Sequence, residues 1–171
     1  MRDGRLLILV VDDQEMPRKF LTGACEELNY GVVTAENGAE AISHVLADYN
    51  NEIDVILLDV EMPVMTGIQA CSRIRGFNPD IPIVFISGHD SQPVIEACFE
   101  AGASQCVTKT DCMQALEELA ERADSYAIER LARRNSHLVK AAGERLKEVV
   151  EMVRNDKGHA NDRRSTDKKI P

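Results

Sequence analysis

Five polar side chains stand at or just after the ends of short apolar runs. Asp12 and Asp13 follow the first run, and Asp59, Ser87 and Lys109 each follow a later one. Clustered carboxylates repel one another and raise one another's pKa unless a cation lies between them. Mg²⁺ prefers oxygen ligands, and an ammonium and a hydroxyl group stabilise charge on phosphoryl oxygens. If the fold brings these side chains together, they predict a receptacle for Mg²⁺ and a phosphoryl group.

Apolar runs alternate with helical patterns along the first 110 residues. We expect strands at Leu6–Val11, Val32–Ala35, Val55–Leu58, Ile83–Ile86 and Cys106–Val107. A run such as the first lacks polar alternation, which is typical of a strand covered on both faces. The alternation predicts an α/β fold, a doubly wound, five-stranded parallel sheet with helices on both faces. In such a sheet a ligand site lies outside the carboxyl ends of the strands, where the five polar side chains stand.

Local signals place the helices between these strands. Pro17 suits a first helical turn, and Gly31 is expected to close that helix. The pairs Asn37 with Glu40 and Thr66 with Gln69 have the spacing of capping boxes. Helical periodicity predicts two buried stripes, one in each of the first two helices: Phe20, Leu21, Ala24 and Leu28, and then Ala41, Ile42, Val45 and Leu46.

Composition excludes several classes of protein. The chain has 171 residues, of which 44% are hydrophobic and 29% charged, as in a globular domain with an appendage. No apolar run approaches the roughly 18 residues of a membrane span, and the start does not resemble a signal peptide. Residues 1–110 hold 7 Lys and Arg against 17 Asp and Glu, a net charge of −10. Such an acidic surface is not expected to bind nucleic acid.

The cysteines indicate a reducing compartment. There are five, at positions 25, 71, 98, 106 and 112, and they form no CxxC motif. Most lie inside apolar stretches, where a free thiol behaves as a small hydrophobe. We therefore expect a cytoplasmic protein with neither disulfides nor a structural zinc site.

Four motifs together resemble the receiver domain of two-component response regulators. They are Val10-Val-Asp-Asp13, Leu58-Asp-Val-Glu-Met-Pro63 with Met65-Thr-Gly67, Ile86-Ser-Gly88, and Ala101-Gly-Ala-Ser104 followed by Lys109. Each motif alone is weak, but their common order and spacing over about residues 5–125 are highly specific. The resemblance implies the flavodoxin-like strand order 2-1-3-4-5.

The resemblance also implies roles for the acidic residues. Asp59 would be the nucleophile that takes a phosphoryl group from a sensor histidine kinase or a phosphotransfer protein. Asp13 would ligate Mg²⁺ directly and Asp12 mainly through water, while Asp59 and the backbone carbonyl of Glu61 complete the metal site. The chain would catalyse only its own phosphorylation and dephosphorylation. We further expect Glu61 and His89 to tune how long the phosphate lasts.

The remaining roles concern the switch between the two states. Lys109 would pair with the phosphoryl oxygens, and the Ser87 hydroxyl would move to the phosphate. Two positions depart from the family: Cys106 replaces an aromatic switch residue, and Thr110 replaces a proline that follows a cis peptide bond. A non-proline cis bond costs about 2.5–4 kcal/mol, so we expect a different loop after Lys109.

Two other functions fit parts of the pattern. A phosphatase of the haloacid dehalogenase type also combines an aspartyl nucleophile with Mg²⁺, but that class has Asp-x-Asp after its first strand, where this chain has Asp12-Asp13. A receiver that no longer takes phosphate would serve purely as an interaction module. The intact carboxylates and Lys109 argue against the second alternative. No DNA-binding or catalytic output domain is recognisable.

The C-terminal region has a helical pattern of its own. From Asp111 to about Val153 there is no proline, and apolar residues recur about every 3.7 residues, which predicts one long amphipathic helix. We expect a receiver domain over residues 1–125, a helical extension over 126–155 and a disordered polar tail over 156–171. The extension would pair with a second copy, as a coiled coil or a short helix pair in a homodimer. Alternatively, it would fold back near Gly143 as a hairpin, or it would begin a linker to a further domain.

Overall fold

The structure is a computed structural model of the whole chain. It describes residues 5–48, 52–88, 91–122, 125, 126, 128, 129, 131–133, 135, 136, 140, 143–148 and 151. The chain divides into two compact units, Met1–Leu131 and Ala132–Pro171. The strands and helices of the α/β fold belong to the first unit.

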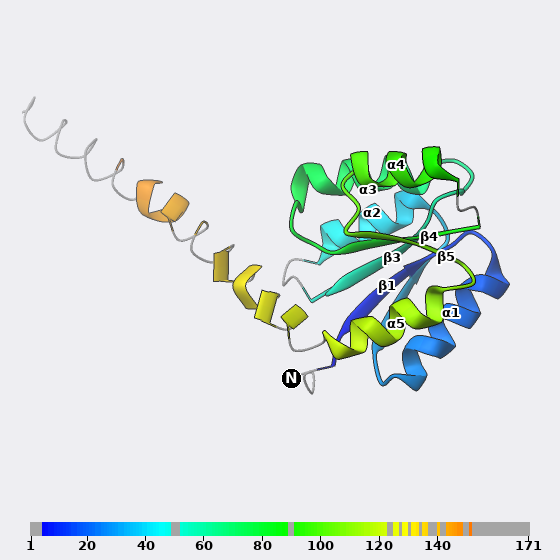
Figure 1. Ribbon diagram of the computed structural model, residues 1–171. Coiled ribbons are helices and arrows are strands. Elements are labelled where there is room, and N and C mark those ends of the chain that lie inside the picture. The colour runs from blue at the N-terminus through cyan, green and yellow to red at the C-terminus, as the bar shows by residue number, and fades with distance from the viewer. Residues whose placement is uncertain are drawn as a thin grey trace, which may run out of the picture. The chain divides into compact units, whose positions relative to one another are not determined.

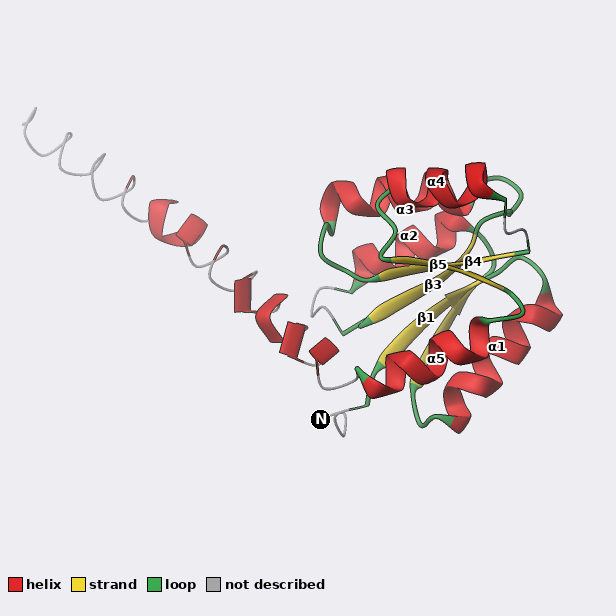
Figure 2. Cartoon of the chain, in the orientation of Figure 1, coloured by secondary structure: helices red, strands yellow, loops and turns green. Residues whose placement is uncertain are grey.

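Five parallel strands and five helices alternate along the first unit. Their bounds are β1 (Leu7–Val11), α1 (Glu15–Glu27), β2 (Gly31–Ala35), α2 (Gly38–Ala47), β3 (Val55–Asp59), α3 (Gly67–Phe77), β4 (Ile83–Ser87), α4 (Gln92–Glu100), β5 (Gln105–Thr108) and α5 (Cys112–Glu121). The strands lie in the order β2-β1-β3-β4-β5. Helices α1 and α5 cover one face of the sheet, and α2, α3 and α4 cover the other (Figure 1, Figure 2). The expected doubly wound α/β fold is confirmed.

The central strand β1 contributes to two cores, one on each face of the sheet. Leu7, Leu9 and Val11 join the core beneath α2, α3 and α4. The alternate residues, among them Ile8 and Val10, join the core beneath α1 and α5. Successive side chains of a strand point to opposite faces, and here both faces are covered. This explains why the run has no polar alternation.

Some of the helix ends agree with those predicted from the sequence, and others differ. Thr66 and Gln69 form a complete capping box at the start of α3. The Asn37 side chain accepts a hydrogen bond from the Glu40 main chain, but the Glu40 carboxylate bonds to the Glu36 main chain and not to the cap residue. The expectation that Gly31 closes the first helix is wrong. α1 ends at Glu27, and the left-handed residue that follows it is Asn29, with φ of 63°.

Two residues of the predicted buried stripes are exposed. Phe20 is 58% exposed and Leu46 is 53% exposed. Each is adjacent in sequence to a buried residue, Leu21 or Val45. One residue turns a helix by about 100°, so a neighbour of a buried residue can lie at the margin of the stripe and face water.

The chain beyond α5 is described only in short pieces. α5 ends at Glu121, and Tyr126 still joins the core beneath α1 and α5. The proposed continuous helix to about residue 153, the hairpin near Gly143 and the disordered tail fall largely on residues outside the described ones. Among the described residues, no helix has both the length and the apolar character that crossing a membrane requires.

Candidate functional site at the carboxyl edge of the sheet

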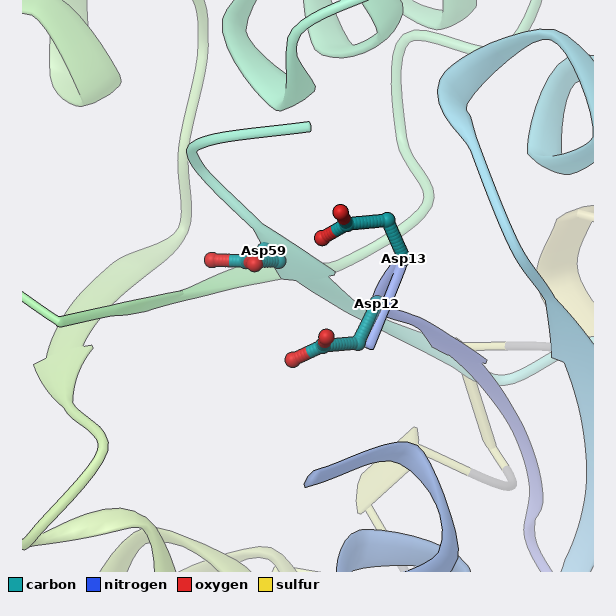
Figure 3. A group of neighbouring side chains, drawn as sticks. All are labelled: Asp12, Asp13 and Asp59. Carbon is teal, nitrogen blue, oxygen red and sulfur yellow. The ribbon is translucent and has the colours of Figure 1, made fainter. Parts of the chain in front are cut away.

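Three carboxylates meet where β1 and β3 end. Asp12 and Asp13 follow β1, and Asp59 is the last residue of β3. One carboxylate oxygen from each residue lies within 4.8 Å of the other two. The side chains of Asp12 and Asp13 flank that of Asp59 (Figure 3). Asp12 is 1% exposed and Asp59 is 4% exposed, so the fold holds two carboxylates almost out of water.

Lys109 connects this acidic cluster to the end of β4. Its ammonium Nζ lies 3.0 Å from Asp12 Oδ2 and 3.3 Å from Asp59 Oδ2. Its main-chain N–H donates to the Ser87 carbonyl oxygen at 2.8 Å, and Ser87 is buried. The five side chains expected to form the site therefore stand at one edge of the sheet.

The two adjacent aspartates differ in how their oxygens are used. Asp12 Oδ1 accepts a hydrogen bond from the Gln14 main chain at 2.8 Å, and Asp12 Oδ2 accepts one from Lys109. Within the described part of the chain, Asp13 Oδ1 is buried and accepts no hydrogen bond. A buried, unpaired carboxylate oxygen is costly, and a hard cation relieves that cost. This oxygen and the all-oxygen donor set fit Mg²⁺.

Electrostatic effects on Asp59 oppose one another. Burial raises the pKa of the Asp59 carboxyl, and the nearby Asp12 charge raises it further, while Lys109 and the Glu61 N–H lower it. The net pKa is raised. Burial lowers the pKa of the Lys109 ammonium, but its hydrogen bond to Asp12 and the charges of both carboxylates outweigh burial and raise the net pKa. Lys109 therefore stays charged, and within the described residues of the cluster this one ammonium faces three carboxylates.

A compact loop leads from β3 to α3. The Gly67 N–H donates to the Val60 carbonyl oxygen at 3.0 Å, which closes the loop behind Asp59. Met62 is buried beneath it, whereas Val64 is 94% exposed with φ of 67°. The Glu61 side chain is exposed. His89, which we expected to act with Glu61, lies outside the described residues.

The loop after Lys109 is arranged by side-chain hydrogen bonds. There is no cis peptide bond in the described residues, so the Lys109–Thr110 bond is trans. The Thr108 hydroxyl lies 2.7 Å from the Thr110 hydroxyl and donates to Asp111 Oδ2 at 2.6 Å. The Asp111 N–H in turn donates to the Thr108 carbonyl oxygen. Threonine hydroxyls and an aspartate thus stabilise the turn at Thr110, where the resemblance described above leads us to expect a proline.

One residue beside the site carries almost no signal in the sequence. Arg18, in the first turns of α1, donates a hydrogen bond to the Asp12 carbonyl oxygen at 2.7 Å. No motif marks this contact. The only available signal is that Arg18 lies six residues after Asp12, at the start of the helix that follows it.

Residues 8–122 match the response regulator receiver domain. The chain belongs to this family. It is a receiver domain of the kind found in the response regulators of two-component systems, in which a phosphorylatable aspartate and Mg²⁺ are typical. This receiver fold is typical of signalling regulators that are not enzymes, and the dehalogenase-type and phosphate-free alternatives are not favoured.

Relatives of the receiver domain include longer proteins. This chain is 36% identical over 115 residues to the response regulator MprA of Mycobacterium sp. (strain KMS), and the match covers 67% of this chain and 47% of MprA. It is 34% identical over 113 residues to the sensor histidine kinase RcsC of Salmonella typhi, covering 66% of this chain and 12% of RcsC. The chain thus spans only a part of these relatives.

A solved structure supports the same fold. The match is to the CheX-CheY-BeF3-Mg²⁺ complex from Borrelia burgdorferi, with a TM-score of 0.61 and 26% sequence identity. It covers 67% of this chain and 88% of the matched chain.

Proposed function

We propose that Asp59 accepts a phosphoryl group from the phosphohistidine of a sensor histidine kinase or a phosphotransfer protein. Asp12, Asp13, Asp59 and the main-chain carbonyl of Glu61 would hold Mg²⁺. The observation that carries this proposal is the meeting of three carboxylates with one lysine, in which Asp13 Oδ1 accepts no hydrogen bond from the described residues. Both RcsC, a sensor histidine kinase, and the CheY complex with BeF3 and Mg²⁺ are consistent with such partners and ligands.

The transfer itself requires an in-line attack by Asp59. A carboxylate oxygen of Asp59 forms the new bond to phosphorus, the P–N bond of phosphohistidine breaks, and the imidazole leaves with that electron pair. Mg²⁺ would supply positive charge to the phosphoryl oxygens. Lys109, 3.3 Å from Asp59 in this structure, is placed to pair with another of these oxygens. The Ser87 hydroxyl would then move onto the phosphate.

The output is a change of conformation and not a product. Contact of Ser87 and Lys109 with the phosphate would favour one of two arrangements of the surface around α4 and β5. Cys106 lies on β5 at the position where the resemblance implies an aromatic switch residue, so no ring at this position carries the change. The chain catalyses only its own phosphorylation and dephosphorylation.

We propose a cytoplasmic setting and protein partners. The free thiols of all five cysteines suit a reducing compartment, and four of them are buried. The acidic charge of the receiver disfavours nucleic acid and favours a basic partner surface. The downstream target is a protein whose identity the chain does not specify.

We retain the division into a receiver (1–125), a helical extension (126–155) and a polar tail (156–171), with a homodimer through the extension. Leu131 is 53% exposed and Leu146 is 65% exposed. Burial of such large apolar side chains against a partner helix would lower the free energy of the pair. Sedimentation equilibrium of the full chain and of a chain stopped after Ser125 tests this. We expect a dimer and a monomer, respectively. Two monomers at tens of micromolar would refute the homodimer.

Intact-protein mass spectrometry tests the phosphoacceptor. Incubation with acetyl phosphate and Mg²⁺ should add one phosphoryl group, about 80 Da, to the wild-type chain. Asp59→Asn should abolish this species, whereas Asp80→Asn, a change at an exposed carboxylate outside the site, should leave it intact. A phosphorylated species that persists in Asp59→Asn contradicts the assignment.

A further inference from the structure

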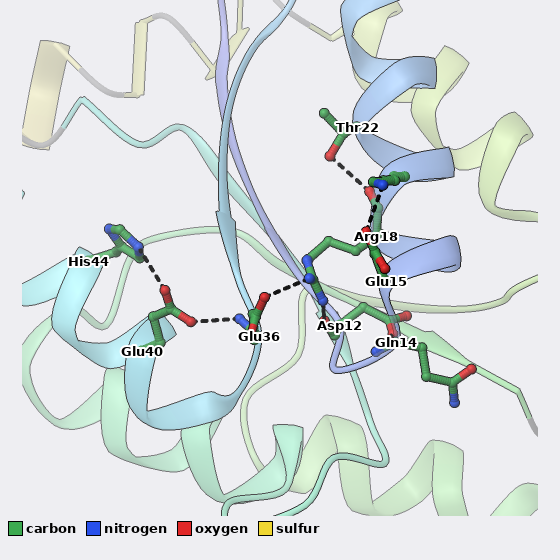
Figure 4. Close-up of polar contacts among 9 residues, drawn as sticks. Asp12, Gln14, Glu15, Arg18, Thr22, Glu36, Glu40 and His44 are labelled. Atoms are coloured by element: carbon green, nitrogen blue, oxygen red, sulfur yellow. Dashed lines mark hydrogen bonds and ion pairs between the residues drawn. The ribbon is translucent and has the colours of Figure 1, made fainter.

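The Arg18 side chain lies between the site and the start of α2. Its Nη1 donates to the Asp12 carbonyl oxygen at 2.7 Å, and its Nη2 donates to Glu36 Oε1 at 2.8 Å (Figure 4). The Arg18 side chain is 13% exposed although that of Glu36 is 68% exposed. The guanidinium group is therefore largely enclosed and held from both sides.

Hydrogen bonds also hold the main chain around Glu36. The Glu36 N–H donates to Glu40 Oε2 at 2.8 Å, and the Glu40 N–H donates to Asn37 Oδ1 at 2.9 Å. These bonds fix the turn between β2 and α2. Arg18 thus ties the end of β1 to a capped helix start through a planar, bidentate group, which a flexible point charge could not replace.

The carbonyl group that Arg18 holds belongs to the peptide that joins Asp12 to Asp13. The orientation of this peptide sets the direction in which the Asp13 side chain leaves the main chain. Asp12 is also fixed through its N–H, which donates to the Ala35 carbonyl oxygen, and through both carboxylate oxygens. The Asp13 Oδ1 atom has no such contact with the described residues, so its placement depends on the main chain before it.

We propose that Arg18 is a positioning residue for the metal site, which directs the Asp13 carboxylate toward Asp59 by holding the Asp12–Asp13 peptide. This proposal rests on the proposed assignment of Asp12 and Asp13 as metal ligands. Groups that orient metal ligands typically change metal affinity 10–100-fold when they are removed.

Charge and position predict opposite effects of removing Arg18. The guanidinium carries a positive charge near the site, which repels Mg²⁺, so loss of the charge alone would tighten Mg²⁺ binding. Loss of the hydrogen bond to the Asp12 carbonyl frees the peptide and would weaken Mg²⁺ binding. The sign of the change in affinity therefore separates a positioning role from a purely electrostatic one.

Calorimetric titration of the full chain with Mg²⁺ is the direct test. We expect Arg18→Ala to weaken binding at least tenfold and Arg18→Lys, which keeps the charge but cannot span both acceptors, to weaken it several-fold. Lys19→Ala is the matched control, because it removes one positive charge from the same helix at a side chain that is 70% exposed and paired with Glu15. It should leave the affinity within twofold of wild type.

Thermal unfolding with and without Mg²⁺ provides a second measurement. A merely structural role would lower the Tm equally in both conditions. A positioning role would also reduce the rise in Tm that Mg²⁺ causes, because that rise depends on affinity.

The outcomes separate this inference from the proposed function. If Arg18→Ala binds Mg²⁺ as tightly as Lys19→Ala or more tightly, the positioning role is refuted. If Arg18→Ala does not fold, Arg18→Lys decides, and wild-type affinity in that variant refutes the role. If the wild-type chain binds no Mg²⁺, the proposed metal site fails instead.

Discussion

Gly67, the first residue of α3, lies so close to the main-chain carbonyl oxygen of Asp59 that a β-carbon on Gly67 would collide with it. The same β-carbon would lie 3.1 Å from Cε1 of Phe85. Glycine is required here by the lack of space and not by backbone conformation. The start of α3 therefore lies directly against the main chain of Asp59, the proposed phosphoacceptor.

Replacement of this glycine should damage both stability and chemistry. We expect Gly67→Ala to lower the free energy of unfolding by about 1–3 kcal/mol, the usual cost of overpacking, and to slow phosphorylation of Asp59. Gly76→Ala in the same helix is the control, since no atom lies within 4 Å of its added β-carbon. It should raise stability by up to about 1 kcal/mol. Urea unfolding measures the stability of each variant, and phosphorylation rates measure the effect on Asp59. A Gly67→Ala chain as stable as the wild type would contradict the prediction.

Val64 should be a site where substitution stabilises the chain. Its φ of 67° is unfavourable for a β-branched residue, and its side chain is 94% exposed, so it contributes little packing. Asparagine tolerates this conformation better, and we expect Val64→Asn to add about 0.5–1 kcal/mol to the free energy of unfolding. Val64→Ala should gain less. A loss of stability in Val64→Asn would mean that the side chain makes a needed contact.

The raised pKa of Asp59 predicts that, in the absence of Mg²⁺, the free energy of unfolding falls as the pH rises. Burial and the Asp12 charge raise the pKa of Asp59 in the folded state above that of the unfolded chain, which is about 3.9. The folded state therefore holds its proton longer, and stability is lost as pH rises through the folded pKa. Asp59→Asn lacks this loss. Its stability advantage over wild type should grow from pH 4 to neutral pH, and a constant difference would contradict the assignment.

Addition of Mg²⁺ at neutral pH should restore the stability that is lost when Asp59 ionises. At a Mg²⁺ concentration of 100 times its Kd, the wild-type chain should gain about 2.7 kcal/mol of stability. Asp59→Asn should gain less, because one of the carboxylates is missing. Chelation by EDTA should return the wild type to its metal-free stability. Equal gains in both chains would place the metal elsewhere.

Thiol reactivity should single out Cys106. Burial raises the pKa of Cys25 and of Cys98 to about 12, and also raises those of Cys71 and Cys112. Cys106 is the half-buried member of the five. Iodoacetamide at neutral pH should therefore label Cys106 first, as peptide mapping would show, and denaturant should expose all five. Cys106→Ser should remove the fast label; labelling of Cys25 first would contradict the described packing.

The sequence could reveal the site because its residues sit at strand ends. Strand ends follow from apolar runs, and parallel strands bring Asp12, Asp59 and Ser87 to one edge whatever the details of the loops. The strand order was not derivable from periodicity and came from the family resemblance. Arg18 remained hidden because a hydrogen bond from a side chain to a distant carbonyl leaves no pattern. Phe20 was misplaced because helical periodicity alone does not show where a buried stripe ends.

The two-faced packing of β1 has a consequence for how this site can be changed. Its alternate residues, such as Val10 and Val11, belong to opposite cores, and the two aspartates that continue the strand flank Asp59 from different sides. Insertion of one residue into β1 would exchange the cores that its side chains enter and reverse which carboxylate meets Lys109. The number of residues in β1 before the paired aspartates is therefore constrained by both cores at once.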